Sequence, residues 1–267
     1  MKLKIALRIL GQKPPDLNLT VLERWKSELW EIHERRIDTL PLSGDSDLAS
    51  WGYSDHALAR KAPAQTGADI TIYILSVPLE DNYYFRRIKR DVACLTFFEV
   101  SDVLRSHGIP IENLVLRMLY SSALIHKRRG CLPAISELPS LAHHETKGCV
   151  FDMNGIKTDI VFSCHHPVLC DACRVAAGGE QVSNEFLDIF QKEIGRIRKK
   201  LYYRAAEGVK RHPLLALGIS SVFAVALGII GSVIAAYLYE GIRRPDQSAQ
   251  ATPAAVTPAA SQLAHQP

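Results

Sequence analysis

The chain lacks the short motifs by which several enzyme classes are recognised. It has no glycine-rich phosphate loop and no Gly-x-Ser-x-Gly nucleophile elbow. His144 and Glu145 begin a His-Glu-x-x-His pattern, but Gly148 stands where the second histidine would be. The sequence therefore offers no P-loop nucleotide site, no hydrolase elbow and no pair of histidines one helical turn apart.

Charge is missing from one long stretch, residues 213–239, which is also apolar. A helix needs about 20 such residues to cross the hydrocarbon core of a bilayer, so this stretch is long enough to span it with some tilt. A buried helix of a soluble protein would rarely run so far without one charged residue. We predict a transmembrane helix over residues 213–239 and a lipid bilayer as a partner.

The charges beside this stretch predict its orientation. Only Arg243 and Arg244 follow it, whereas many basic residues precede it: Lys192, Arg196, Arg198, Lys199, Lys200, Arg204, Lys210 and Arg211. The positive-inside rule places residues 1–212 in the cytoplasm and the tail on the opposite side. Residues 1–10 resemble the start of a signal peptide, but Arg8 interrupts their apolar core and we interpret them as a strand. We expect a single-pass protein.

The chain has a formal net charge of +4, and its basic residues are concentrated just before the predicted span. Anionic lipid headgroups lie at that depth, and each basic residue near them contributes on the order of 1 kcal/mol of attraction. A membrane surface therefore explains the charge more simply than a nucleic acid, which we do not expect as a partner. The six cysteines lie in the part assigned to the cytoplasm, so we expect reduced thiols.

Residue patterns before position 130 predict a mixed α+β domain. Apolar and β-branched runs indicate strands over residues 2–10, 68–77 and 92–95. Helical spacing indicates helices over residues 21–37 and 111–127, and Thr96 with Glu99 predicts a capping box for a helix ending near Gly108. Residues 38–67 are expected to form a long loop. A loop around Glu80 and Arg86 is expected to be a solvated face, with a phosphate or nucleotide pocket as the alternative.

Residues 150–162 predict a β-hairpin, because Asn154-Gly155 suits the type I′ turn that needs two positive φ angles. The motif Cys170-x-x-Cys173 follows shortly after this predicted hairpin. Farther on, Ser183 is expected to cap a long helix that runs, with a kink at Gly208 or Pro213, into the span.

Two thiolates three residues apart can hold one side of a tetrahedral zinc ion, and the remaining ligands must come from elsewhere. Cys149, at the start of the predicted hairpin, is the nearest third ligand, and Cys164 or His144 the fourth. Four protein ligands would make the zinc site structural. The alternatives are inert buried thiols and a redox-active pair, although the latter favours the start of a helix after a strand.

These motifs together resemble the archaemetzincin family of zinc proteases. Cys149, Cys170 and Cys173 match the cysteines of that family's structural zinc site, and His144-Glu145 matches the first two letters of its catalytic motif. The resemblance implies a structural zinc more than a protease. It makes His144 and Glu145 the candidate catalytic residues of an alternative function, that of a membrane-tethered metallohydrolase.

Small residues recur every four positions in the predicted span and would form one ridge: Ser220, Ala224, Gly228, Ser232 and Ala236. Such ridges let two helix backbones approach closely in lipid, so we expect the span to form homo-oligomers.

The sequence thus predicts an α+β cytoplasmic domain with a zinc-knuckle-like hairpin, a helical stalk and one C-terminal transmembrane helix. The expected boundaries are 1–148 for the α/β part, 149–180 for the hairpin and Cys-x-x-Cys, 181–212 for the basic stalk, 213–239 for the span and 240–267 for a disordered tail. We expect a non-enzymatic sensor or effector that binds a protein or small-molecule ligand, of the kind found in bacterial signalling or defence systems.

Overall fold

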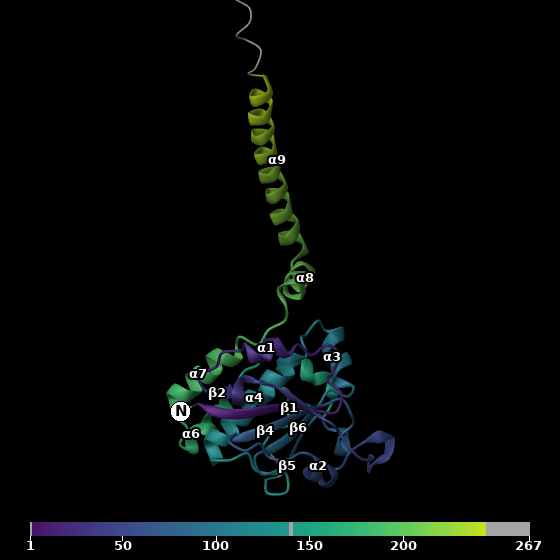
Figure 1. Cartoon of the computed structure of the whole chain (residues 1–267). Coiled ribbons are helices and arrows are strands. Elements are labelled where there is room, and N and C mark those ends of the chain that lie inside the picture. Colours follow the sequence, from purple (N-terminus) through teal and green to yellow (C-terminus); the bar gives the residue numbers. More distant parts are fainter. Residues whose placement is uncertain (1, 139–140, 244–267) are drawn as a thin grey trace, which may run out of the picture. The chain divides into compact units, whose positions relative to one another are not determined.

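The computed structural model describes residues 2–138 and 141–243, and the chain divides into two compact units, Met1–Arg204 and Ala205–Pro267. The first unit is an α+β domain built on a six-stranded sheet (Figure 1). The second unit contains most of helix α8 and all of helix α9, and each unit is described by itself.

Three parallel strands form the centre of the sheet: β1 (Leu3–Leu10), β4 (Ile70–Leu75) and β6 (Val92–Thr96). All residues of β4 and β6 are buried, because helices or loops cover both faces of the sheet. The strand order is β2-β1-β4-β6-β5, with β2 (Trp30–Ile32) and β3 (Asp38–Leu40) both paired to β1. Strand β5 (Phe85–Lys89) is antiparallel and lies at the edge. The predicted strands at 2–10, 68–77 and 92–95 are confirmed.

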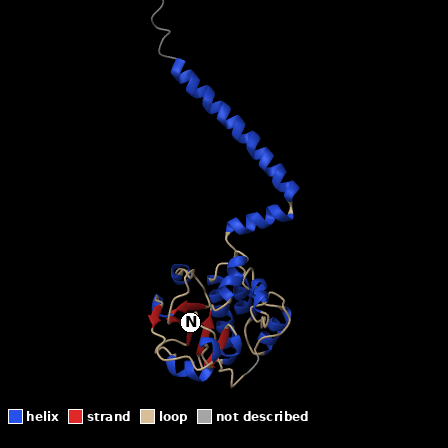
Figure 2. Ribbon diagram, turned by 90° about the vertical axis from the view of Figure 1, so that its right-hand side faces the viewer, coloured by secondary structure: helices blue, strands red, loops and turns tan. Residues whose placement is uncertain are grey.

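Helix α4 (Glu112–Arg129) is the central helix of the larger apolar cluster, which contains Ile5 and Ile72 from one face of the sheet. The smaller cluster contains Tyr73 from the other face and Leu58 from α2 (Asp55–Lys61). Strands and helices can be followed in Figure 2. The predicted helix at 111–127 is confirmed.

The remaining helices of the first unit are α1 (Leu19–Glu23), α3 (Val100–Ser106), α5 (Ile160–Ser163), α6 (Asp171–Gly179) and α7 (Asn184–Ile194). The short 3₁₀ turns are η1 (His33–Arg35), η2 (Ala49–Trp51), η3 (Glu80–Asn82) and η4 (Lys157–Asp159).

The predicted helix over residues 21–37 is wrong. Helix α1 begins after Asn18, whose side chain accepts a hydrogen bond from Thr20 N at 3.1 Å, but it ends at Glu23. The chain then forms β2, in which Trp30 and Ile32 are buried and Glu31 between them is exposed. Strand alternation of these three residues therefore replaces the expected helical face.

The capping box at Thr96 and Glu99 is also wrong. Thr96 ends β6, and its hydroxyl donates to Val77 O at 2.6 Å and accepts from Phe98 N at 3.1 Å. Glu99 has a positive φ of 62° and pairs with Lys157 at 2.7 Å. The long loop expected at 38–67 contains β3, η2 and α2.

The predicted hairpin at residues 150–162 does not form. Turns are followed by η4 and α5, with no strand in this range. Asn154 has the expected positive φ of 50°, but its side chain is buried and donates to Ser163 Oγ at 3.1 Å. Asn154 therefore faces the protein interior, which a hairpin tip would not do.

Ser183 caps α7 as predicted, accepting from Phe186 N at 3.3 Å. The helix is not continuous with the span, however. It ends at Ile194, α8 runs over Leu201–Arg211, and α9 runs over Pro213–Arg243. Pro213 is tolerated as the first residue of α9 because the first turn of a helix needs no N–H donor.

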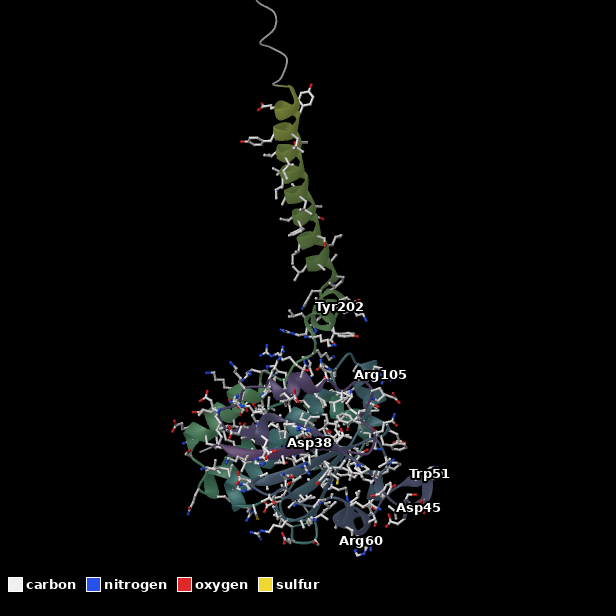
Figure 3. All side chains as sticks on the ribbon, in the orientation of Figure 1. Asp38, Asp45, Trp51, Arg60, Arg105 and Tyr202 are labelled. Atoms are coloured by element: carbon white, nitrogen blue, oxygen red, sulfur yellow. The ribbon has the colours of Figure 1, made fainter. Side chains whose placement is uncertain are left out.

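Within α9, Pro213–Glu240 is long and apolar enough to cross a membrane, and its most apolar part is not buried in the protein. Its side chains project outward around the helix, as does Tyr202 in α8 (Figure 3). The predicted tail lies outside the described residues from position 244 on.

Candidate metal centre

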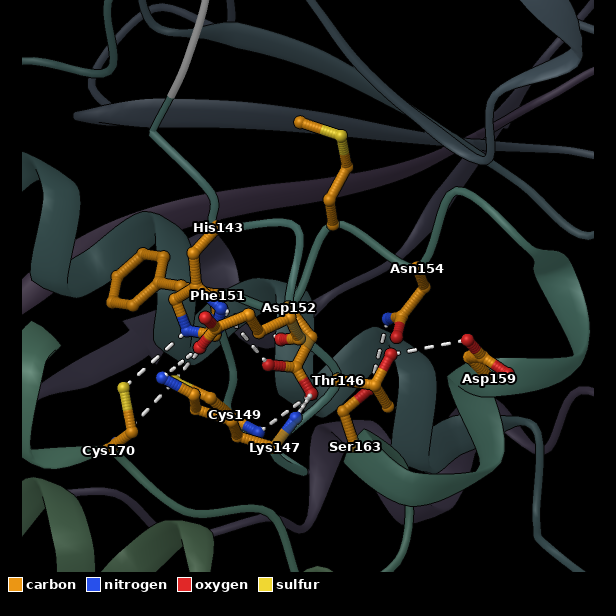
Figure 4. Close-up of polar contacts among 12 residues, drawn as sticks. His143, Thr146, Lys147, Cys149, Phe151, Asp152, Asn154, Asp159, Ser163 and Cys170 are labelled. Atoms are coloured by element: carbon orange, nitrogen blue, oxygen red, sulfur yellow. Dashed lines mark hydrogen bonds and ion pairs between the residues drawn. The ribbon is translucent and has the colours of Figure 1, made fainter.

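Four potential metal ligands converge in the first unit. One donor atom each from His143, Cys149, Cys170 and Cys173 lies within 4.8 Å of each of the others. In the described parts of the chain, 2–138 and 141–243, this is the one group of three or more His, Cys, Asp or Glu residues with such convergence. The surrounding polar contacts are drawn in Figure 4.

Backbone pairing brings the separate segments together. His143 N donates to Phe151 O at 3.1 Å, and Met153 N donates to His143 O at 3.0 Å. Val150 N donates to Val168 O at 2.9 Å, which places the residues before Cys170 beside Cys149. Glycine at position 148 lets the backbone pass close to Phe162. Its φ is +72°, and an added Cβ would lie 3.2 Å from Phe162 O.

The Cys-x-x-Cys motif opens a helix, a context that the sequence pattern did not indicate. Cys170 is the extended residue just before α6, and Cys173 lies within the first turn. A redox pair needs only these two thiols. Here a third thiol and an imidazole join them, and this is the composition of a Cys₃His metal site.

The pKa values of Cys149 and Cys173 shift in opposite directions, because the two thiols are hydrogen-bonded to each other. A hydrogen bond from Cys173 is the main cause that lowers the pKa of Cys149 to about 4, while burial opposes this. Phe151 N at 3.4 Å and Cys170 N at 3.5 Å also donate to its sulfur. The pKa of Cys173 is raised, because its proton is the one shared with Cys149. The cluster thus stabilises negative charge on sulfur, as a cation site requires.

His143 is oriented as a ligand. Its Nδ1 lies 2.9 Å from Glu145 O and 3.5 Å from Asp152 Oδ1, whereas Nε2 lies 3.5 Å from Cys170 Sγ. Donation from Nδ1 leaves the Nε2 lone pair facing the thiols.

Asp152 supports this arrangement from the Nδ1 side of His143. Its Oδ2 accepts from Lys147 N at 3.0 Å and Cys149 N at 2.9 Å. Its Oδ1 is buried without a hydrogen-bond partner among the described residues. Burial raises the pKa of this carboxyl group. A carboxylate behind the imidazole is the usual support of a histidine ligand, so the residues fit a zinc ion held by three sulfurs and one nitrogen.

Three of the predicted ligands, Cys149, Cys170 and Cys173, come together in the structure, but the fourth member of the group is His143 and neither Cys164 nor His144 belongs to it. Cys164 is buried against α4, where its carbonyl accepts from Asn113 Nδ2 at 2.8 Å. Burial raises the pKa of Cys164 to about 12, which keeps it a neutral thiol.

His144 follows His143 in a segment of bends and lies outside the converging group. His143 faces the thiols, and His144 is exposed. Glu145 is also exposed and forms an ion pair with Lys147, which lowers the pKa of Glu145. The candidate catalytic pair therefore lies on the surface, outside the cluster.

The expected solvated face around Glu80 and Arg86 is confirmed for Asp81 and Asn82, which are exposed, but it is wrong for the arginines. Arg86 and Arg87 are both buried. Arg86 pairs with Asp55 at 2.6 Å and Asp81 at 2.8 Å, and Arg87 donates to the carbonyls of Pro133 and Leu138, each at 2.6 Å.

No protein-family model and no curated protein matches the chain. A solved structure that is similar is that of archaemetzincin from Methanopyrus kandleri, with 14% sequence identity and a TM-score of 0.45. The match covers 67% of this chain and 96% of that chain. The resemblance noted in the sequence is thus found again, as a weak and partial one. At this TM-score it carries no conclusion about activity.

The ridge of small residues lies along α9 as spaced in the sequence. Ser220, Ala224, Gly228, Ser232 and Ala236 are all exposed, and a Cβ added at Gly228 would meet nothing within 4 Å. Ser220 Oγ donates to Ala216 O at 2.8 Å within the helix.

Proposed function

We propose that this chain is a membrane-anchored binding protein of the sensor or effector type, whose cytoplasmic domain is stabilised by a structural zinc. The closed donor set of His143, Cys149, Cys170 and Cys173 is the observation that carries the proposal. Catalytic zinc sites keep one position open for water or substrate, whereas structural sites are filled by four protein ligands.

A zinc ion bound to these four residues would supply a tetrahedral cross-link and the folding free energy that accompanies it. His143 and Cys149 belong to the turns before residue 154, and Cys170 and Cys173 belong to the start of α6. The cross-link would therefore hold two segments that make few regular backbone pairs with each other. Its role is to fix this side of the domain in one conformation.

The anchor of this proposal is α9. The basic residues before Pro213 support a cytoplasmic first unit and a tail on the opposite side of the membrane. The spacing of α8 would add a second membrane contact: Leu201, Ala205 and Val209 recur every four residues, while Lys210 lies on the other side. Leu201 and Val209 are exposed. Helices of this kind lie in the headgroup region, with the apolar face in the acyl chains and the basic face toward anionic lipid.

Self-association through the ridge from Ser220 to Ala236 would bring the domains of two or more chains together. Close backbone packing is a main attraction between helices in lipid, because lipid tails solvate large apolar side chains as well as a partner helix does. An assembly of this kind suits a sensor or effector, whose output depends on the number of domains gathered at one place.

A dual reporter assay in a bacterial host tests the anchor. A reporter that is active only outside the cytoplasm should be active when fused after Pro267 and inactive when fused before Met1. Alkaline washing of membranes should leave the full chain in the pellet and release a variant that ends at Arg211. Reversed reporter signals would overturn the orientation. Release of the full chain by alkaline washing would overturn the anchor itself.

A metallohydrolase is the alternative function. It requires a second metal ion near His144 and Glu145 and a peptidase activity that His144→Ala abolishes. The matched variant His143→Ala should instead remove the structural zinc. Peptidase activity with two metal ions per chain would replace the binding function with the enzymatic one.

A further inference from the structure

A cavity of about 280 Å³ lies between α4, the edge strand β5 and the segment 150–153. Apolar and aromatic side chains form most of its wall, among them Tyr83, Phe85, Met118, Ile125, Phe151 and Met153. Its size is near the lower end of small-molecule pockets, roughly 300–1,000 Å³. Its ligand would therefore be small and largely apolar.

Arg117 brings a charge into this apolar wall. It comes from the middle of α4 and is only 1% exposed. Nη1 donates to Tyr84 OH at 2.9 Å and Nη2 donates to Asp152 O at 2.6 Å. Nε has no hydrogen-bond partner among the described residues. Two of the five guanidinium N–H groups thus donate to neutral oxygens, and the guanidinium also interacts with the Cys164 thiol.

No carboxylate within the described ranges forms an ion pair with Arg117. Asp152 offers Arg117 its main-chain carbonyl, while its carboxylate accepts from Lys147 N and Cys149 N. A buried charge without an ion-pair partner is costly, and an arginine in a protein cannot lower that cost by losing its proton. A ligand with a negative charge would supply what the protein does not.

A second cation of the cavity wall has the same character. Arg87 is 7% exposed and donates to the carbonyls of Pro133, Ala134 and Leu138. It too forms no ion pair among the described residues. The acidic residue Asp81 also lines the cavity, but it is paired with Arg86 at 2.8 Å. The charged residues of the wall are three arginines and two aspartates, so the cavity is largely apolar and carries a formal charge of +1: Arg86, Arg87, Arg117, Asp81 and Asp152.

We propose that this cavity binds a small apolar carboxylate, with Arg117 as the residue that holds the carboxylate group. The guanidinium fork matches a planar carboxylate through two parallel hydrogen bonds. The apolar remainder of the ligand lies against Met118, Ile125 and Phe151. This site is separate from the four metal ligands and does not depend on the membrane anchor.

Two sources can supply this chemistry, a free organic acid and the C-terminal carboxylate of a peptide. Isothermal titration of the full chain in detergent micelles distinguishes them with two probes, 3-phenylpropionate and N-acetyl-Ala-Phe. Each is paired with its neutral amide as a control of the same shape. The proposal expects one or both acids to bind at least tenfold more tightly than the matching amide.

Arg117→Met keeps much of the side-chain volume without the charge, and should reduce the affinity for the acid at least tenfold. Exchange of a buried charge for an apolar side chain is often tolerated, so this variant should fold. If it does not, Arg117→Lys keeps the charge without the fork and should also bind the acid less tightly than the unmodified chain. Arg60→Met, at an exposed position outside the cavity, is the control and should leave the affinity unchanged.

Three results would overturn the proposal. The unmodified chain binds neither acid, it binds acid and amide equally, or the folded Arg117 variants bind the acid as tightly as the unmodified chain. A purely structural role of Arg117 predicts altered unfolding in these variants without any acid-specific binding to lose.

Discussion

Helices α4 and α9 are both long and rich in apolar residues, yet their surroundings differ. Every side chain of α4 from Glu112 to Ile125 is buried, including the charged Glu112 and Arg117. The large apolar side chains of α9 are exposed, and no charge occurs between residues 213 and 239. The two helices therefore differ in burial, and the exposed residues 213–239 of α9 are the ones without charge.

The protein interior explains the charges of α4. Glu112 accepts from Asn18 N at 2.6 Å, and Arg117 donates to Tyr84 and Asp152. Fixed polar partners make a buried charge tolerable, whereas lipid offers none at the centre of a bilayer. Residues 213–239 of α9, which carry no charge, are therefore suited to lipid, where a charge would find no fixed polar partner.

Loss of zinc from the metal centre should have the largest effect, because the segment around the metal ligands also provides hydrogen-bond acceptors for α4. Asn113 and Arg117 donate to the carbonyls of Cys164 and Asp152. Binding of zinc to a structural site contributes on the order of 10–16 kcal/mol of apparent free energy. Cys173→Ala should therefore make residues 141–180 sensitive to limited proteolysis, and added chelator should do the same to the unmodified chain.

Cys94→Ala and Cys131→Ala are the controls for this prediction, because these thiols are buried outside the metal centre. Both should stay close to the unmodified chain in protease sensitivity. Equal sensitivity of all these cysteine variants would mean that the converging thiols bind no metal.

Charges placed in α9 give the next largest effect. Each arginine at the centre of a transmembrane helix costs about 2.5–3.5 kcal/mol of insertion free energy. Leu227→Arg with Ile230→Arg should lower the fraction of the chain that resists alkaline washing, and should leave the unfolding of the first unit unchanged. The pair Leu227→Ile and Ile230→Leu is the matched control. Full membrane retention of the arginine pair would remove the contrast between the two helices.

An unpaired charge in α4 gives a smaller but still large effect. Leu119 is completely buried, and an arginine there would place a charge among apolar side chains. An uncompensated buried charge costs about 3–5 kcal/mol. Leu119→Arg should lower the denaturation midpoint of the full chain in detergent, followed by tryptophan fluorescence, while Leu119→Met changes it little. An unchanged midpoint would show that α4 is less tightly enclosed than described.

The ridge on α9 gives the smallest effect. Gly228 is at its centre, where a larger side chain separates two packed helices over the greatest length. Gly228→Leu should weaken self-association of the span by on the order of 1 kcal/mol in a membrane two-hybrid assay. Ile229→Leu, off the ridge, should leave it intact. Without any self-association of the unmodified span, α9 is an anchor alone.

Those parts of the fold that form continuous patterns were predictable from sequence. The β-branched run around Ile72 gives β4, and the apolar spacing of Leu114, Met118 and Ile125 gives α4. The errors lie where local patterns compete with distant contacts. Trp30 and Ile32 fit both a helix and a strand, and pairing with β1 decides for the strand. Asn154 suits a turn, but burial of its amide beside Ser163 decides the conformation.

The metal centre was predictable in part, for a similar reason. Cys-x-x-Cys and a nearby cysteine indicate a metal site by spacing alone. Whether His143 or His144 joins them depends on which of two adjacent side chains faces the thiols, and the bridge between His143 and Asp152 determines this. In the sequence, Arg117 is notable only as a charged residue within the apolar pattern of a predicted helix. Its role depends on a cavity that only the folded chain forms.

Metal content of the purified full chain tests the central claim most directly. Elemental analysis should find one zinc per chain, and none after His143→Ala or Cys170→Ser. His144→Ala and Cys164→Ser should retain the zinc, because these residues lie outside the converging group. No zinc in the unmodified chain, or zinc lost on His144→Ala but kept on His143→Ala, would contradict the account.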